Sequence, residues 1–142
     1  MSSAKPLTTK LPEGYKPNDS EKFMGVKQQR YFTQLLLNWK EDLLNESRQT
    51  ISNMQTDSLS HADAADRASS ETDRSLELRA SDRQRKLISK IDAAIRRIED
   101  GSFGYCEETG DPISLARLEA RPIATFSLDA QERHERNERV GR

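Results

Sequence analysis

A long stretch without helix breakers is the feature that most constrains this chain of 142 residues. Glycine occurs at position 25 and next at 101, and proline at 17 and next at 112, so residues 26–100 contain neither. These two residues destabilise a helix interior most, by about 1 kcal/mol for glycine and about 3 kcal/mol for proline relative to alanine. The stretch therefore predicts long helices.

Two apolar stripes divide this stretch into two predicted helices. The first stripe is Phe32, Leu36, Trp39 and Leu43, with Ile51 and Met54 further on. The second is Leu76, Ala80, Arg83, Leu87, Ile91, Ala94 and Ile98. Steps of three and four residues are typical of a coiled-coil seam, in which Arg83 is an unusual polar member. We predict two antiparallel helices, near 27–56 and 69–100, with a tip near 56–68.

The composition excludes several classes of protein. Hydrophobic residues make up 33% of the chain, well below the roughly 45–50% of ordinary globular domains, so a large round core is excluded. The net charge of −1 argues against direct binding to duplex DNA, and the longest aliphatic run, residues 35–37, is too short for a membrane span. A single cysteine excludes an intramolecular disulfide and fits the reducing cytoplasm.

The composition changes after Gly101. We predict an N-terminal arm over residues 1–25, the helical finger over 26–100, a small globular base over 101–128, and a C-terminal helix with its tail over 129–142. Asp129 is the predicted N-cap of that last helix. The predicted core of the base consists of Phe103, Tyr105, Ile113, Leu115, Leu118, Ile123, Phe126 and Leu128. The fold class is therefore mainly α: a long antiparallel coiled-coil hairpin on a small base, with a C-terminal helix.

Charge is distributed unevenly along the predicted hairpin. Residues 56–73 carry a net charge of −4, whereas residues 74–97 carry a net charge of +5. Solvated helix faces explain such a pattern, and so does a surface that contacts a partner. The charges alone leave both explanations open.

Several short strings together carry a resemblance to a known family. FGYCE spans residues 103–107 and RLEARP spans 117–122, while LELR at 76–79, DRQRKLI at 82–88 and DAADRA at 63–68 add to them. In this combination the chain resembles the DksA/TraR family of RNA polymerase-binding transcription factors, over about residues 22–139. The resemblance implies a coiled-coil finger on a small globular base, which agrees with the helices predicted from the residues.

The chain departs from the family pattern at the zinc site. Family members typically hold zinc through four cysteines spaced C-x2-C-x17-C-x2-C, and the matching positions here are Cys106, Thr109, Ser127 and Ala130. Structural zinc needs four ligands arranged as a tetrahedron, usually thiolates and imidazoles. We therefore expect a degenerate zinc-finger-like region that holds no metal, and a zinc-independent member of the family without a cofactor.

The resemblance also implies a role for the predicted tip. In the family, the tip enters the secondary channel of RNA polymerase, and its acidic residues lie near the catalytic centre. The matching residues here are Asp63, Asp66, Arg67 and Ala68. The alternative is an ordinary polar turn between two helices.

Two further groups of residues match family positions at the polymerase interface. Arg79 and Arg83 match polymerase contacts on the shaft of the finger. Leu87, Lys90 and Arg121 match a site for guanosine tetraphosphate (ppGpp), in which a family lysine is replaced here by Gln131. Arginine and lysine suit phosphate oxygens through charge-assisted hydrogen bonds. The alternative is a set of solvated basic residues.

We therefore expect a non-enzymatic regulator of transcription initiation. It would bind RNA polymerase through the secondary channel, respond to ppGpp in the stringent response, and act as a cytoplasmic monomer that contacts neither DNA directly nor membranes. Two alternatives stay open: a Gre-like factor that assists transcript cleavage, and a self-associating coiled-coil scaffold.

Overall fold

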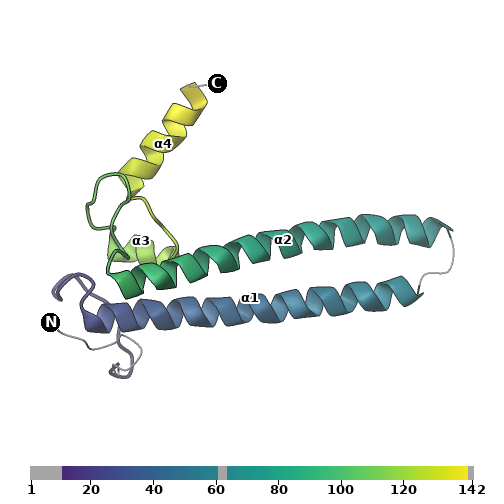
Figure 1. The fold of residues 1–142 in the computed structure, drawn as a ribbon, viewed down its shortest axis with the longest axis horizontal. Coiled ribbons are helices and arrows are strands. Elements are labelled where there is room, and N and C mark those ends of the chain that lie inside the picture. The colour runs from purple at the N-terminus through teal and green to yellow at the C-terminus, as the bar shows by residue number, and fades with distance from the viewer. Residues whose placement is uncertain (1–10, 61–63, 141–142) are drawn as a thin grey trace. The chain divides into compact units, whose positions relative to one another are not determined.

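The computed structural model describes residues 11–60 and 64–140 and is mainly helical, as predicted. The four helices are α1 (Val26–Ser60), α2 (Ala64–Asp100), α3 (Leu115–Ala120) and α4 (Leu128–Val140) (Figure 1). Outside the helices, the described residues contain one isolated antiparallel bridge, between Tyr105 and Pro112. No helix in these ranges combines the length and the apolarity needed to cross a membrane.

The chain forms two compact units. One contains residues 1–37 and 91–142 and is called the base unit here; the other contains residues 38–90 and is called the hairpin unit. Within each unit, α1 and α2 run side by side in opposite directions (Figure 1). Both long helices contribute to both units.

The long helices extend further than the sequence pattern predicted. α1 continues to Ser60 and α2 begins at Ala64, so most of the predicted tip, 56–68, is helical. The apolar repeat stops in this stretch, but a helix needs only local hydrogen bonds and residues that tolerate helical dihedral angles. Alanines at 64, 65 and 68 favour the helix, and no glycine or proline interrupts it.

In the hairpin unit, the two helices are joined by a polar contact and by a partly buried seam. The Gln84 side-chain amide donates a hydrogen bond to Glu46 Oε2 at 3.2 Å, and Leu43 is buried. The prediction of a buried seam is wrong for Leu76, which is 56% exposed, and Arg83 is also exposed. Because Gln84 pairs with Glu46, Leu76 lies level with a part of α1 well beyond Leu43, the last described residue of α1 that is buried.

In the base unit, the same two helices form a well-packed core. Phe32, Leu36, Ile91 and Ala94 are fully buried, and Ile98 is 4% exposed, as the stripes predicted. A few apolar residues are therefore enough to form a core in this unit, because the two helices and the loops beyond them contribute to the same core.

Most of the predicted core residues after Gly101 complete this core, but two of them are exposed. Phe103, Ile113, Leu115, Leu118 and Ile123 are buried, and Phe126 is half-buried. The prediction is wrong for Tyr105, which is 38% exposed, and for Leu128, which is 57% exposed. Leu128 is the first residue of α4, whose buried side is formed by Ala130.

The start of α4 also differs from the prediction. The hydroxyl of Ser127 accepts a hydrogen bond from the Ala130 backbone N–H at 3.3 Å, which is the geometry of a helix N-cap. Asp129 is the acidic residue in the first turn rather than the cap. Both residue types favour a helix start, so sequence alone placed the boundary two residues late.

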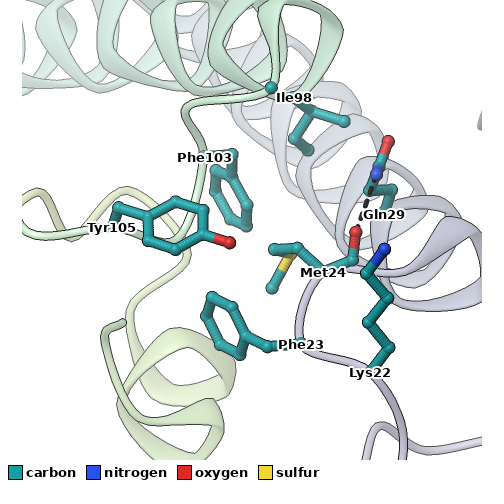
Figure 2. Close-up of a pocket in the computed structure, with 8 residues that line it drawn as sticks. Lys22, Phe23, Met24, Gln29, Ile98, Phe103 and Tyr105 are labelled. Atoms are coloured by element: carbon teal, nitrogen blue, oxygen red, sulfur yellow. Dashed lines mark hydrogen bonds between the residues drawn. The ribbon is translucent and has the colours of Figure 1, made fainter. Parts of the chain in front are cut away.

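The segment before α1 lies within the base unit and packs against α1 and Tyr105. The Met24 N–H donates to Gln28 Oε1 at 2.8 Å, and the Gln29 amide donates to the Met24 carbonyl oxygen at 2.7 Å. The Phe23 ring meets the Tyr105 ring edge-on at a centroid distance of 5.3 Å. Phe23, Met24, Gln29, Phe103 and Tyr105 are among the residues that line a pocket (Figure 2). The volume of this pocket is about 140 Å³. This segment therefore contributes to the base unit.

Candidate functional site

The residues of the predicted tip lie at the edge of what the structure describes. Asp63 lies outside the described residues. Asp66, Arg67 and Ala68 belong to the first turns of α2, and their side chains lie outside the description. The helical backbone places Asp66 as the third residue of α2.

The shaft residue Arg79 lies on a mixed apolar and polar face of α2. A hollow of about 360 Å³ lies along this face and is lined by Glu71, Thr72, Ser75, Leu76 and Arg79. Leu76 is 56% exposed and Leu78 is 51% exposed, so large apolar side chains stand in solvent beside the arginine. Sequence reasoning missed these leucines as surface residues, because the stripe placed Leu76 in a buried seam.

The second predicted shaft residue, Arg83, is also exposed on α2. It lies four residues after Arg79, and residues spaced in this way are neighbours on a helix surface. The exposed side chains of Arg79 and Arg83 therefore share one face of α2 in the hairpin unit. Its exposed apolar and arginine side chains are residue types found at protein–protein interfaces.

The three residues predicted to bind nucleotide belong to different units. Leu87 is half-buried and Lys90 is exposed, and both lie on α2 in the hairpin unit. Their spacing of three residues makes them neighbours on the helix surface. Arg121 is exposed and belongs to the base unit. Within the hairpin unit, Leu87 and Lys90 thus offer an apolar group beside a cation.

Backbone hydrogen bonds fix the position of Arg121, and its side chain is exposed to solvent. It is the C-cap of α3, and its N–H donates to the Arg117 carbonyl oxygen at 2.7 Å. Its own carbonyl oxygen accepts from the Ala124 N–H at 3.0 Å. The Arg117 guanidinium donates to the Phe126 carbonyl oxygen at 2.9 Å, which ties α3 to the segment before α4. Among the described residues, the Arg121 side chain forms no ion pair.

A long-range contact that sequence reasoning missed joins α1 to α3. The Tyr31 hydroxyl donates to Glu119 Oε1 at 2.8 Å, across 88 residues of sequence. Burial raises the pKa of Tyr31 above its usual value, and the hydrogen bond and negative charge of Glu119 raise it further. A lone tyrosine and a lone glutamate carry no pairing signal in the sequence.

Three of the four degenerate zinc positions, Cys106, Thr109 and Ser127, lie together, and Cys106 is 3% exposed. Burial raises the pKa of the Cys106 thiol, but hydrogen bonds from the Thr109 hydroxyl and from the backbone N–H groups of Ser127, Thr109 and Glu108 outweigh it and lower the pKa to about 6. The Gly110 N–H closes the loop by donating to the Cys106 carbonyl oxygen at 2.8 Å. The loop therefore surrounds the sulfur with hydrogen-bond donors.

α4 is attached to this loop through its first two turns. Glu108 Oε2 lies 3.9 Å from Arg133 Nη2 and 4.0 Å from His134 Nε2. The His134 ring packs against the Phe126 ring at a centroid distance of 4.7 Å. Gln131, which replaces a family lysine, donates to Glu135 Oε1 at 3.2 Å. It is neutral, so it supplies no charge to the predicted nucleotide site.

Comparison with known proteins identifies two family segments. Residues 28–98 match the model for the N-terminal domain of DnaK suppressor protein DksA, and residues 101–136 match the model for the prokaryotic dksA/traR C4-type zinc finger. A protein of Caulobacter vibrioides named RNA polymerase-binding transcription factor DksA is 68% identical over 128 residues, which cover 90% of each chain. The Escherichia coli protein of the same name is 40% identical over 119 residues, covering 84% of this chain and 79% of its own.

A solved structure supports the same relationship at the level of the fold. The structure of transcription factor DksA2 from Pseudomonas aeruginosa matches with a TM-score of 0.79 and 38% identity. The match covers 87% of this chain and 94% of that one.

The zinc-finger match corrects the prediction that this chain takes no cofactor. Residues 101–136 belong to a segment type that binds zinc in the family, so the expectation of a zinc-free protein is contradicted. The four positions here supply one thiol, two hydroxyls and a methyl group, which do not fit a site of four cysteines. The described residues contain no cluster of three or more histidine, cysteine or acidic side chains that could hold a metal.

Sequence, fold and family segments thus agree over nearly the whole length of the chain. The family models span residues 28–98 and 101–136, and the DksA proteins that match are named as RNA polymerase-binding transcription factors. This protein is a member of the DksA/TraR family.

Proposed function

We propose that this protein regulates transcription initiation by binding RNA polymerase through the secondary channel. The observation that carries the proposal is the 68% identity over 90% of the chain to a factor named for polymerase binding. At this level of identity, the surfaces that bind a large partner are expected to persist together with the fold. The exposed arginine and leucine side chains on α2 provide such a surface.

Docking and action are assigned to different parts of the hairpin. The exposed Arg79 and Arg83, beside Leu76 and Leu78, supply a face that suits an acidic and partly apolar partner. The acidic residues of the tip, Asp63 and Asp66, act near the polymerase catalytic centre, together with Arg67 and Ala68. Carboxylates there interact with Mg²⁺, with its water shell or with basic side chains of the polymerase. Affinity therefore depends mainly on α2, and the regulatory effect depends on the tip.

The response to ppGpp is assigned to Leu87, Lys90 and Arg121, as part of a stringent-response function. Lys90 and Arg121 are exposed cations, and a guanidinium matches phosphate oxygens in two-point hydrogen bonds. Leu87 supplies an apolar surface next to Lys90. With Gln131 in place of a family lysine, the response rests on these remaining cations.

The proposal also covers the location, oligomeric state and activity of the protein. The protein acts as a cytoplasmic monomer without enzymatic activity and without direct contact to DNA or membranes, because its partner is the polymerase. The nearly balanced charge of the chain supports the absence of duplex binding. Sedimentation of the purified protein as a dimer would instead favour a self-associating scaffold.

The experiment that tests the proposal separates binding from action. Asp66→Asn removes one charge at nearly constant volume, and Asp73→Asn makes the same change at an exposed position two helical turns further along α2. In transcription from a ribosomal-type promoter, Asp66→Asn should lose inhibition while its polymerase affinity stays within a few fold of the parent. Asp73→Asn should retain both properties.

Full inhibition by Asp66→Asn would refute the assignment of the tip. A Gre-like function is tested in the same preparation by adding the protein to stalled elongation complexes. Stimulated cleavage of the transcript would replace the proposed function with that alternative.

A further inference from the structure

The contact between Tyr31 and Glu119 lies next to a cation to which the proposed function assigns a ligand. Glu119 is in the last turn of α3, and Arg121 follows two residues later as the C-cap of that helix. An unrestrained glutamate so close in sequence to an arginine competes with any anionic ligand for the guanidinium. In the structure the Glu119 carboxylate instead accepts the Tyr31 hydroxyl at 2.8 Å.

Aromatic packing fixes the position of the Tyr31 side chain. Its ring packs edge-on against Phe32, at a centroid distance of 5.3 Å, and against Tyr15, at 6.1 Å. Phe32 is fully buried in the base unit, so the tyrosine hydroxyl projects from a rigid support. A donor fixed in this way holds a carboxylate at a smaller entropic cost than a mobile side chain would.

The short helix that carries Glu119 gains from a second attachment. α3 has six residues, and its buried side consists of Leu115 and Leu118. Apolar contacts are non-directional and restrict rotation of so short a helix only weakly. Its directional restraint toward α4 is the hydrogen bond from Arg117 to the Phe126 carbonyl oxygen. The hydrogen bond from Tyr31 of α1 adds a directional restraint on α3. Because the Arg121 N–H donates to the Arg117 carbonyl oxygen of α3, this restraint also fixes the backbone of Arg121.

We propose that Tyr31 is a positioning residue for the anion site at Arg121: its hydroxyl holds the Glu119 carboxylate against α1 and leaves the Arg121 guanidinium free for the phosphates of ppGpp. The inference rests on the proposed function, because it takes Arg121 as a phosphate contact. It adds two residues, Tyr31 and Glu119, that bind no ligand themselves.

Removal of the hydroxyl tests this role. Tyr31→Phe keeps the ring and its packing, and it should raise the ppGpp concentration that gives half of the nucleotide-dependent inhibition by about three- to tenfold, the range of one lost hydrogen bond. Inhibition without nucleotide should stay as in the parent. The chain also offers a matched control, since the Tyr15 hydroxyl donates to Glu21 at 2.7 Å in the same unit. Tyr15→Phe should leave the half-maximal concentration unchanged.

A second substitution distinguishes positioning from simple loss of stability. In Tyr31→Phe/Glu119→Gln the freed side chain is neutral and no longer competes for Arg121, so the half-maximal concentration should return to within about twofold of the parent. A double variant as impaired as Tyr31→Phe alone, or an equal defect in Tyr15→Phe with an equal fall in melting temperature, would overturn the inference.

Arg121→Ala separates failure of the inference from failure of the proposed function. A raised half-maximal concentration in Arg121→Ala with an unchanged one in Tyr31→Phe overturns the positioning role alone. An unchanged concentration in Arg121→Ala removes Arg121 from the proposed site and overturns the positioning role with it.

Discussion

Substitution of Gly104 tests how tightly the segment before α1 is packed against Gly104 within the base unit. Gly104 has φ +90°, and an added Cβ would lie 3.1 Å from Phe23 Cζ and 3.2 Å from Met24 Cγ. An L-residue in the left-handed region costs about 1–2 kcal/mol. Forcing a methyl group into a packed site costs about 1–3 kcal/mol more. Gly104→Ala should therefore lower the free energy of unfolding by about 2–5 kcal/mol.

Gly110 provides a matched control for the backbone part of this cost. It has φ +77°, and nothing lies within 4 Å of an added Cβ. Gly110→Ala should therefore lose only about 1–2 kcal/mol. Urea denaturation of the parent and both variants, followed by far-ultraviolet circular dichroism, measures the difference. Phe23→Leu shortens the side chain in closest contact and should restore part of the loss in the Gly104→Ala background.

Equal losses of stability for Gly104→Ala and Gly110→Ala would refute the packing argument. They would mean that the Phe23 and Met24 side chains move aside at little cost. A loss in Gly104→Ala that Phe23→Leu does not reduce would place the cost entirely in the backbone.

Three further predictions concern the nucleotide response, acid stability and the start of α4. Lys90→Ala should weaken the ppGpp-dependent inhibition about tenfold or more, as expected for one charge-assisted hydrogen bond, whereas Lys86→Ala, the same loss of charge one turn earlier, should leave the nucleotide titration unchanged. The hydrogen bond from the Tyr15 hydroxyl lowers the pKa of Glu21 in the folded protein below its usual 4.5. The stability that this bond contributes is therefore present above pH 4.5 and is lost as the pH falls through the lowered pKa of Glu21. In acid denaturation curves, the stability difference between the parent and Tyr15→Phe should shrink below about pH 4.5. Ser127→Ala removes the N-cap of α4 and should lower the free energy of unfolding by about 1 kcal/mol, whereas Ser127→Asp keeps an acceptor and should lose less, as thermal melts can show.

Local patterns in the sequence were enough to predict the two long helices. The absence of glycine and proline between residues 26 and 100 permits helix, and the stripe ending in Ile91, Ala94 and Ile98 identifies the buried face at the base. Both signals are local, because helical hydrogen bonds join residues only four apart. Motifs near residues 103–122 likewise identified the family without any structure.

The exposure of apolar residues, in contrast, depended on what lies opposite them. Leu76 belongs to the same stripe as Ile98, yet it is 56% exposed whereas Ile98 is 4% exposed. The difference comes from the facing helix and from the loops of the base unit, which cover one end of the stripe. A periodic pattern states which side of a helix is apolar and not whether anything covers it.

The sequence by itself therefore determined the long helices, the family and the positions that match its functional residues. The tertiary structure decided how Cys106, Thr109 and Ser127 meet, how the segment before α1 packs beside Gly104, and that Tyr31 holds Glu119 beside Arg121. The first group depends on neighbours along the chain, whose spacing the sequence states directly. The second depends on side chains up to 88 residues apart, whose meeting is set by the packing of the whole base unit and by no local pattern.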